Sequence, residues 1–132
     1  MVGEWALSLL GAGIFATDPV SGYPPGTPDQ LPGYTWHGAL YDLFSLPDFA
    51  ALAPACFVFG SRFAARSERG WAVYSFFTGL AFTVALVLAG AGFGQAEGLV
   101  DVAGLFQRLA VTIGFGWLTL LAVRLLRSSP ER

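Results

Sequence analysis

Long apolar stretches separated by short polar connections dominate the pattern of this chain. A helix needs about 20 apolar residues to cross the hydrocarbon core of a bilayer. Residues 71–92 and 102–126 meet that length. Residues 38–62 form a third such stretch, and its two prolines are compatible with a membrane helix. The pattern therefore predicts three full transmembrane helices.

A fourth apolar stretch, residues 4–15, covers about half of a bilayer. It is a truncated span, an interfacial segment, or the end of a helix that begins upstream of Met1. Residues 16–35 follow as a loop rich in proline and glycine, which excludes regular structure there. We expect an all-α fold over residues 1–132: a single membrane domain, built as a polytopic helical bundle of three full transmembrane helices plus a short N-terminal hydrophobic helix.

The charged residues are distributed unequally between the connections. Arginines lie in the loop 62–70 and at the C-terminus, whereas the connections 16–35 and 92–101 contain acidic residues and no arginine. Basic loops remain on the cytoplasmic side of a membrane. We expect a multi-pass protein of the cell (plasma) membrane, with loop 62–70 and the C-terminus cytoplasmic and the two acidic connections extracytoplasmic.

The composition agrees with a membrane location. Hydrophobic residues make up 55% of the chain and charged residues 12%, whereas soluble domains carry about 25% charge. The net charge is -2 and the sequence shows no basic patch, so we expect the lipid bilayer and no nucleic acid as partner. Small residues along the helices allow close packing, either within one bundle or in a homo-oligomer or larger membrane complex.

Missing residue types exclude several kinds of chemistry. The chain has no lysine, which excludes a lysine Schiff base and a P-loop ATPase. Cys56 is the single cysteine and His37 the single histidine. A thiolate zinc site, an iron–sulfur cluster and bis-histidine haem ligation are excluded within one chain. We expect no metal and no cofactor.

Two opposite charges fall at membrane depth. At about 1.5 Å per residue, Arg108 and Asp48 both lie about 10–12 Å below the outer edge of the bilayer core. A lone charge there costs at least about 2.5–3.5 kcal/mol on insertion scales. We therefore expect Arg108 to meet an acid, and Asp48, Asp42 and Asp18 are the alternatives.

Polar side chains also recur between Trp36 and Asp48 at intervals of four, four and three residues. In a helix these intervals place the side chains on one face. Together with the pair at positions 107 and 108, they would line an outward-facing pocket beneath the loop 16–35. The candidate ligand-binding residues are Asp18, His37, Tyr41, Asp42, Ser45, Asp48, Gln107 and Arg108.

Three interpretations of this polar cluster stay open: a structural polar core, a binding pocket for a lipid headgroup, small solute or ion, and a catalytic site. The chain lacks the motifs GxSxG and HExxH and a Cys–His dyad. We expect binding rather than catalysis and assign no catalytic residue. The alternatives are a structural or accessory subunit of a larger membrane complex and a transporter half-unit, and a membrane lipid hydrolase has the least support.

Two segments resemble an uncharacterised prokaryotic membrane family called domain of unknown function 998. GAGIFATDP, a Gly/Pro-rich loop and TWHGALYDLFS resemble its outer-face signature, and GLFQRLAVTIGFGWL resembles its last conserved helix. The resemblance covers about residues 11 to 126 and implies a polytopic bundle without an agreed activity. Members usually have further spans before the Asp-Pro loop, so we expect a shortened member or a fragment. The matching positions are Asp18, Pro19, His37, Gln107 and Arg108.

Overall fold

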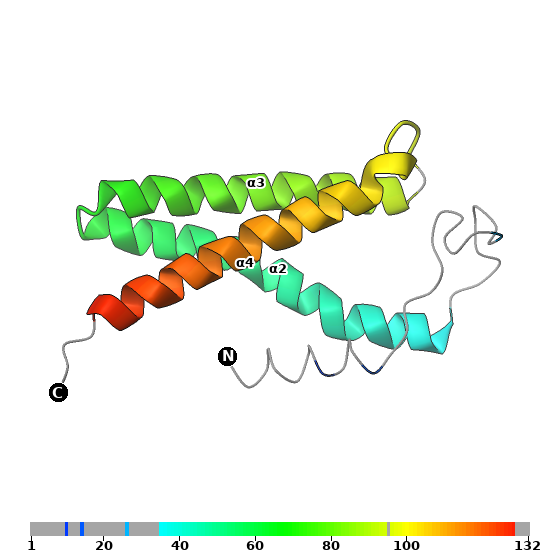
Figure 1. Ribbon diagram of the computed structural model, residues 1–132, viewed down its shortest axis with the longest axis horizontal. Helices are drawn as coiled ribbons and strands as arrows, with labels where there is room; N and C mark the ends of the chain where they lie inside the picture. Colours follow the sequence, from blue (N-terminus) through cyan, green and yellow to red (C-terminus); the bar gives the residue numbers. More distant parts are fainter. Residues whose placement is uncertain (1–9, 11–13, 15–25, 27–34, 95, 129–132) are drawn as a thin grey trace. The chain divides into compact units, whose positions relative to one another are not determined.

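The computed structural model describes residues 10, 14, 26, 35–94 and 96–128 (Figure 1). The chain divides into two compact units, residues 1–51 and 52–132. All regular structure in the described ranges is helical. The elements are α2 (Trp36–Ala65), α3 (Arg69–Phe93), the short 3-10 helix η1 (Val100–Val102) and α4 (Ala103–Ser128).

The three predicted transmembrane stretches are confirmed as helices. Helices α2, α3 and the continuous η1–α4 segment are each long and apolar enough to cross a membrane. Helix α2 continues through both Pro47 and Pro54. The stretch 4–15 lies largely outside the described residues, although Leu10 and Ile14 are helical.

Helix α3 shows how these helices suit a bilayer. Small residues and hydroxyl groups make up most of its buried side, including Ala72, Ser75 and Gly79. Its large apolar side chains mostly point outward: Phe77 is 70% exposed and Val87 64%. Each such side chain left in water forgoes about 1.5–3 kcal/mol of burial, whereas lipid solvates it. The protein is therefore a multi-pass membrane protein.

Within the 52–132 unit, close backbone approaches hold the helices together. A Cβ on Gly79 would lie 2.9 Å from the Cβ of Cys56 on α2. A Cβ on Gly114 would collide with Leu52 and lie 3.1 Å from the ring of Phe82. Both glycines are buried. Glycine at these positions allows α2, α3 and α4 to pack tightly.

The turn between α2 and α3 is short because α2 ends in a Schellman motif. The Glu68 amide donates to the Phe63 carbonyl at 2.9 Å, and the Ser67 amide donates to the Ala64 carbonyl at 3.0 Å. Ser67 adopts the left-handed conformation, with φ of 60°. Helix α3 then begins at Arg69, and the Glu68 carbonyl accepts a hydrogen bond from the Ala72 amide at 3.0 Å.

At the other end, α3 and α4 are joined through η1. A Cβ on Gly92 would lie 2.6 Å from both the Ala103 Cβ and the Leu99 carbonyl oxygen. The last turn of α3 and the first turn of α4 are therefore in direct contact. Gly98 turns the chain in this connection with φ of +77°, a conformation that glycine adopts without strain.

Candidate functional site

The first predicted group of polar residues lies at the start of α2. Thr35 caps the helix, because its hydroxyl oxygen accepts a hydrogen bond from the Gly38 amide at 3.2 Å. His37 is exposed, and its ring centroid lies 3.6 Å from that of Trp36. Tyr41 and Ser45 follow at intervals of four residues and are half-buried. The helical spacing of these three residues is confirmed.

The acidic candidates are described less fully. Asp42 and Asp48 belong to α2, but their side chains are outside the described part of the structure. Asp18 lies outside it altogether. The ion pair between Arg108 and one of these carboxylates thus stays a prediction.

The second predicted group, Gln107 and Arg108, lies on α4 and is exposed. At 100° per residue, Arg108 projects away from the side of α4 that buries Ala110 and Trp117. Its carbonyl accepts a hydrogen bond from the Thr112 hydroxyl at 2.8 Å. Among the described residues, no carboxylate forms an ion pair with its guanidinium. This exposed cation on an apolar helix is available to a ligand or to a carboxylate elsewhere in the chain.

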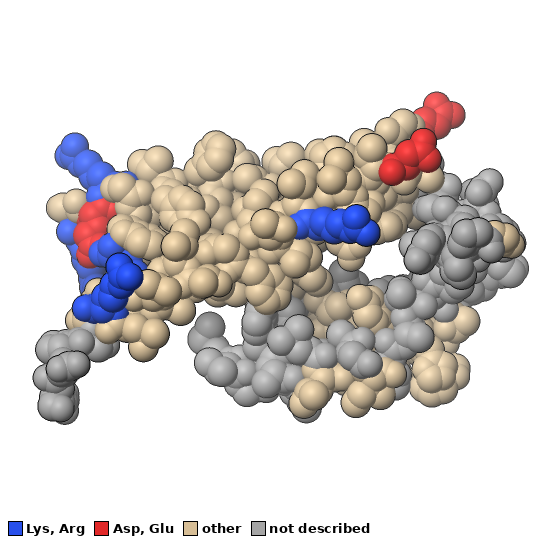
Figure 2. Space-filling view, viewed as in Figure 1, with Lys and Arg blue, Asp and Glu red and all other residues tan. Residues whose placement is uncertain are grey.

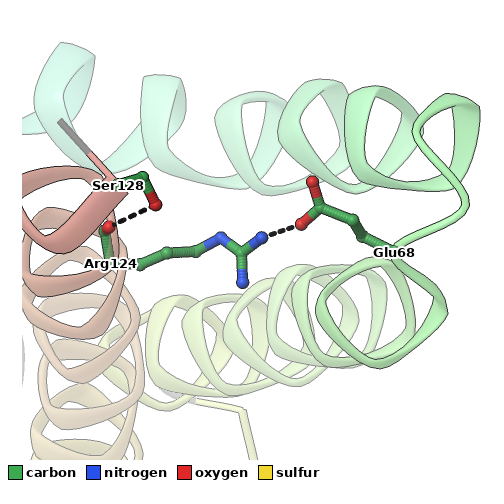
Figure 3. Close-up of polar contacts among 3 residues, drawn as sticks. All are labelled: Glu68, Arg124 and Ser128. Atoms are coloured by element: carbon green, nitrogen blue, oxygen red, sulfur yellow. Dashed lines mark hydrogen bonds and ion pairs between the residues drawn. The ribbon is translucent and has the colours of Figure 1, made fainter. Parts of the chain in front are cut away.

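A polar cluster that the sequence reasoning missed lies at the opposite end of α4. Arg124 forms an ion pair with Glu68, and its own carbonyl accepts a hydrogen bond from the Ser128 hydroxyl at 2.8 Å (Figure 3). The guanidinium carbon also lies 5.0 Å from the Phe63 ring centroid and 4.7 Å from that of Trp71. The two charged side chains are 26% and 29% exposed. This cluster joins the ends of α2, α3 and α4.

One sequence signal pointed to this cluster. Glu68 is the single acid in the arginine-rich loop 62–70, and opposite charges this close attract each other. Its partner was not evident, because several arginines lie nearer to it in the sequence than Arg124 does. The pairing follows from the packing of α4 against the α2–α3 turn.

A shallow apolar groove lies between α3 and α4, in the half of these helices nearer to η1. Its volume is about 380 Å³. Phe77, Val84 and Leu88 line it from α3, and Phe106 and Ile113 line it from α4. All of the residues that line it are apolar.

Residues 1–124 match the model of the family described as "Protein of unknown function (DUF998)". No curated protein and no solved structure matches the chain.

Proposed function

The chain belongs to the DUF998 family, and from that premise we propose that this membrane protein binds a small ligand. The proposed site is an outward-facing polar pocket formed by the polar face of α2 and by Gln107 and Arg108 of α4. Its ligand is a lipid headgroup, a small solute or an ion. In this proposal the acidic connections 16–35 and 92–101 are extracytoplasmic, and the site opens toward that side.

The exposure of Arg108 is the observation that carries the proposal. A guanidinium at this depth is costly unless it meets an opposite charge or water. Its side chain projects from the side of α4 that does not pack against α3, and the described residues supply no carboxylate for it. An anionic group on a ligand would supply the missing charge, because arginine binds carboxylates and phosphates with two parallel hydrogen bonds.

The face of α2 adds groups of complementary chemistry. Tyr41 and Ser45 carry hydroxyl groups that donate and accept hydrogen bonds. His37 is exposed at the start of the helix, and its imidazole has nitrogens that can donate or accept hydrogen bonds. A ligand with both an anionic and a hydrogen-bonding part fits this combination best.

A thermal-stability screen in detergent tests the proposal. Purified protein is melted with phospholipids, divalent metal ions and small anions, because a ligand that binds the folded state raises its melting temperature. The same screen is run on His37→Ala and Arg108→Gln. Ser61→Ala is the control, since its exposed hydroxyl donates to the Phe57 carbonyl, far from the proposed site along α2.

We expect at least one ligand to stabilise the wild type and the Ser61→Ala control but neither site variant. If no ligand shifts the wild type and Arg108→Gln alone melts much lower, the cluster is a structural ion pair and the proposed pocket is wrong.

A second candidate function is that of an accessory subunit. Gly104 and Gly116 of α4 are exposed, and a Cβ at either position would meet nothing within 4 Å. Open glycines on a membrane helix allow another helix to approach closely. If this surface binds a partner, Gly116→Leu should lower the mass of the complex extracted from membranes without lowering the melting temperature of the isolated chain.

A further inference from the structure

One end of the 52–132 unit carries a concentration of exposed arginines (Figure 2). Arg62 lies in the last turn of α2, and Arg127 lies in the last turn of α4. Arg66 and Arg69 flank the turn between α2 and α3. We call these four exposed residues the arginine end. The described acids of the opposite end, Glu97 and Asp101, are also exposed.

Glu68, the acid nearest in sequence to the arginine end, already forms an ion pair. Glu68 pairs with Arg124, whose guanidinium also stacks against Phe63 and Trp71. In the described ranges, no carboxylate pairs with any of the four exposed arginines. The same ion pair ties the turn to α4, and Arg127 lies one helical turn beyond Arg124. The excess positive charge is thus held in one place by the fold.

Exposed apolar side chains lie directly beside these charges. Val58, Val73 and Val123 are 51%, 67% and 38% exposed. They lie four residues from Arg62, Arg69 and Arg127, respectively, and each valine is nearer to the middle of its helix than the arginine is. Residues four apart share a helix face. Three of the four arginines therefore have an exposed apolar side chain beside them on the same face of the same helix.

We propose that the arginine end binds anionic phospholipids of the adjoining leaflet. Arginine binds phosphate with paired hydrogen bonds, and the valines beside it contact the acyl chains. A free phosphate ion would use the charges but would gain nothing from the apolar surface. Arg124 takes no part in this binding because Glu68 neutralises it. The bound lipids are phosphatidylglycerol-like, with a net negative headgroup, rather than zwitterionic.

Native mass spectrometry of the full chain in detergent tests this proposal. The protein is mixed with equal amounts of phosphatidylglycerol and phosphatidylcholine that carry the same acyl chains, and the bound fractions are compared. The variants are the triple replacement Arg66→Gln, Arg69→Gln and Arg127→Gln, and the control Glu97→Gln, which removes an exposed charge at the opposite end of the 52–132 unit.

We expect the wild type and Glu97→Gln to prefer phosphatidylglycerol. The preference should fall by about fivefold for each arginine removed from the arginine end. Equal binding of both lipids by the wild type, or an unchanged preference in the triple variant, would overturn the proposal. So would an equal loss in Glu97→Gln, because the change of any exposed charge would then suffice.

Two further measurements test the proposal. Raising the salt from about 0.1 M to about 1 M shortens the Debye length from about 10 Å to about 3 Å, so the wild-type preference should weaken strongly. A preference that does not change with salt contradicts the proposal. Inorganic phosphate alone should not raise the melting temperature of the Arg108→Gln variant, which lacks the anion-binding residue of the proposed pocket. If phosphate stabilises this variant as much as phosphatidylglycerol does, the arginine end takes free phosphate instead of lipid.

Discussion

The indole of Trp117 is completely buried, and its N–H donates to the Ser75 hydroxyl at 3.1 Å. The hydroxyl is also fully buried. The rings of Trp117 and Phe59 of α2 meet edge to face, with centroids 5.8 Å apart. One side chain of α4 thus contacts both other helices, and its single polar atom has a defined partner.

Removing that partner has a predictable cost. Ser75→Ala leaves the Trp117 N–H unpaired, so we expect the free energy of unfolding to fall by about 1 kcal/mol. Ser75→Ala combined with Trp117→Phe removes both polar groups, and the double-mutant cycle should show favourable coupling between them. Unfolding in mixed micelles measures both effects. Additive losses in the cycle would show that the hydrogen bond contributes nothing to stability.

Two glycines of α4 make a matched pair for a second prediction. A Cβ on Gly114 would collide with Leu52, whereas a Cβ on Gly116 would meet nothing within 4 Å. We expect Gly114→Ala to lower the free energy of unfolding by about 1–3 kcal/mol, because a packed interface must move apart. Gly116→Ala should leave it unchanged or raise it slightly, since alanine favours helix. Melting temperatures of the two variants in the same detergent give the comparison, and equal values would contradict it.

At the scale of single elements, the turn between α2 and α3 contains local strain. Ser67 is the described non-glycine residue with positive φ, and this conformation costs about 1–2 kcal/mol outside glycine. Glycine would relieve the strain but would add freedom to the unfolded chain. We therefore expect Ser67→Gly to stabilise the protein by about 0.5–1 kcal/mol. Thermal unfolding checks this, and a destabilised variant would mean that the Ser67 side chain makes a contribution of its own.

The helices were predictable from the sequence because their length follows from the thickness of a bilayer. The predicted stretch 71–92 and the observed α3 differ by at most two residues at each end. Helix ends were less predictable: α2 starts at Trp36 because Thr35 caps it. Hydrogen bonds to backbone amides decide where a helix begins, and the hydrophobicity of the sequence does not indicate that position.

The candidate site was predictable only where local geometry defines it. The helical spacing of His37, Tyr41 and Ser45 needed nothing beyond a helix, and the structure has one there. The pair between Glu68 and Arg124 joins residues far apart in the sequence, and no periodicity indicates it. The full burial of Trp117, whose N–H pairs with Ser75 of another helix, likewise depends on packing between helices.

At the scale of the whole molecule, the charge distribution makes a prediction about orientation. A cysteine at Gly70, beside the arginine-rich turn, should be cytoplasmic, and one at Glu97 should be extracytoplasmic. Both positions are exposed, and a Cys56→Ala background removes the native thiol. A membrane-impermeant maleimide should label the Glu97→Cys variant in intact cells and the Gly70→Cys variant only after permeabilisation. The reverse labelling pattern would show that the chain has the opposite topology.

The contact between Gly92 and Ala103 also bears on how the protein is made. It brings the end of α3 against the start of α4 across a short connection whose charges are Glu97 and Asp101. Helices α3 and α4 can thus insert into the bilayer together as a helical hairpin. Only the short connection between them, with its two acids, then has to cross the membrane. The arginines before α3 and near the end of α4 would remain on the cytoplasmic side of the membrane. Biogenesis would then require the translocon to move only this tip across the membrane for the two helices.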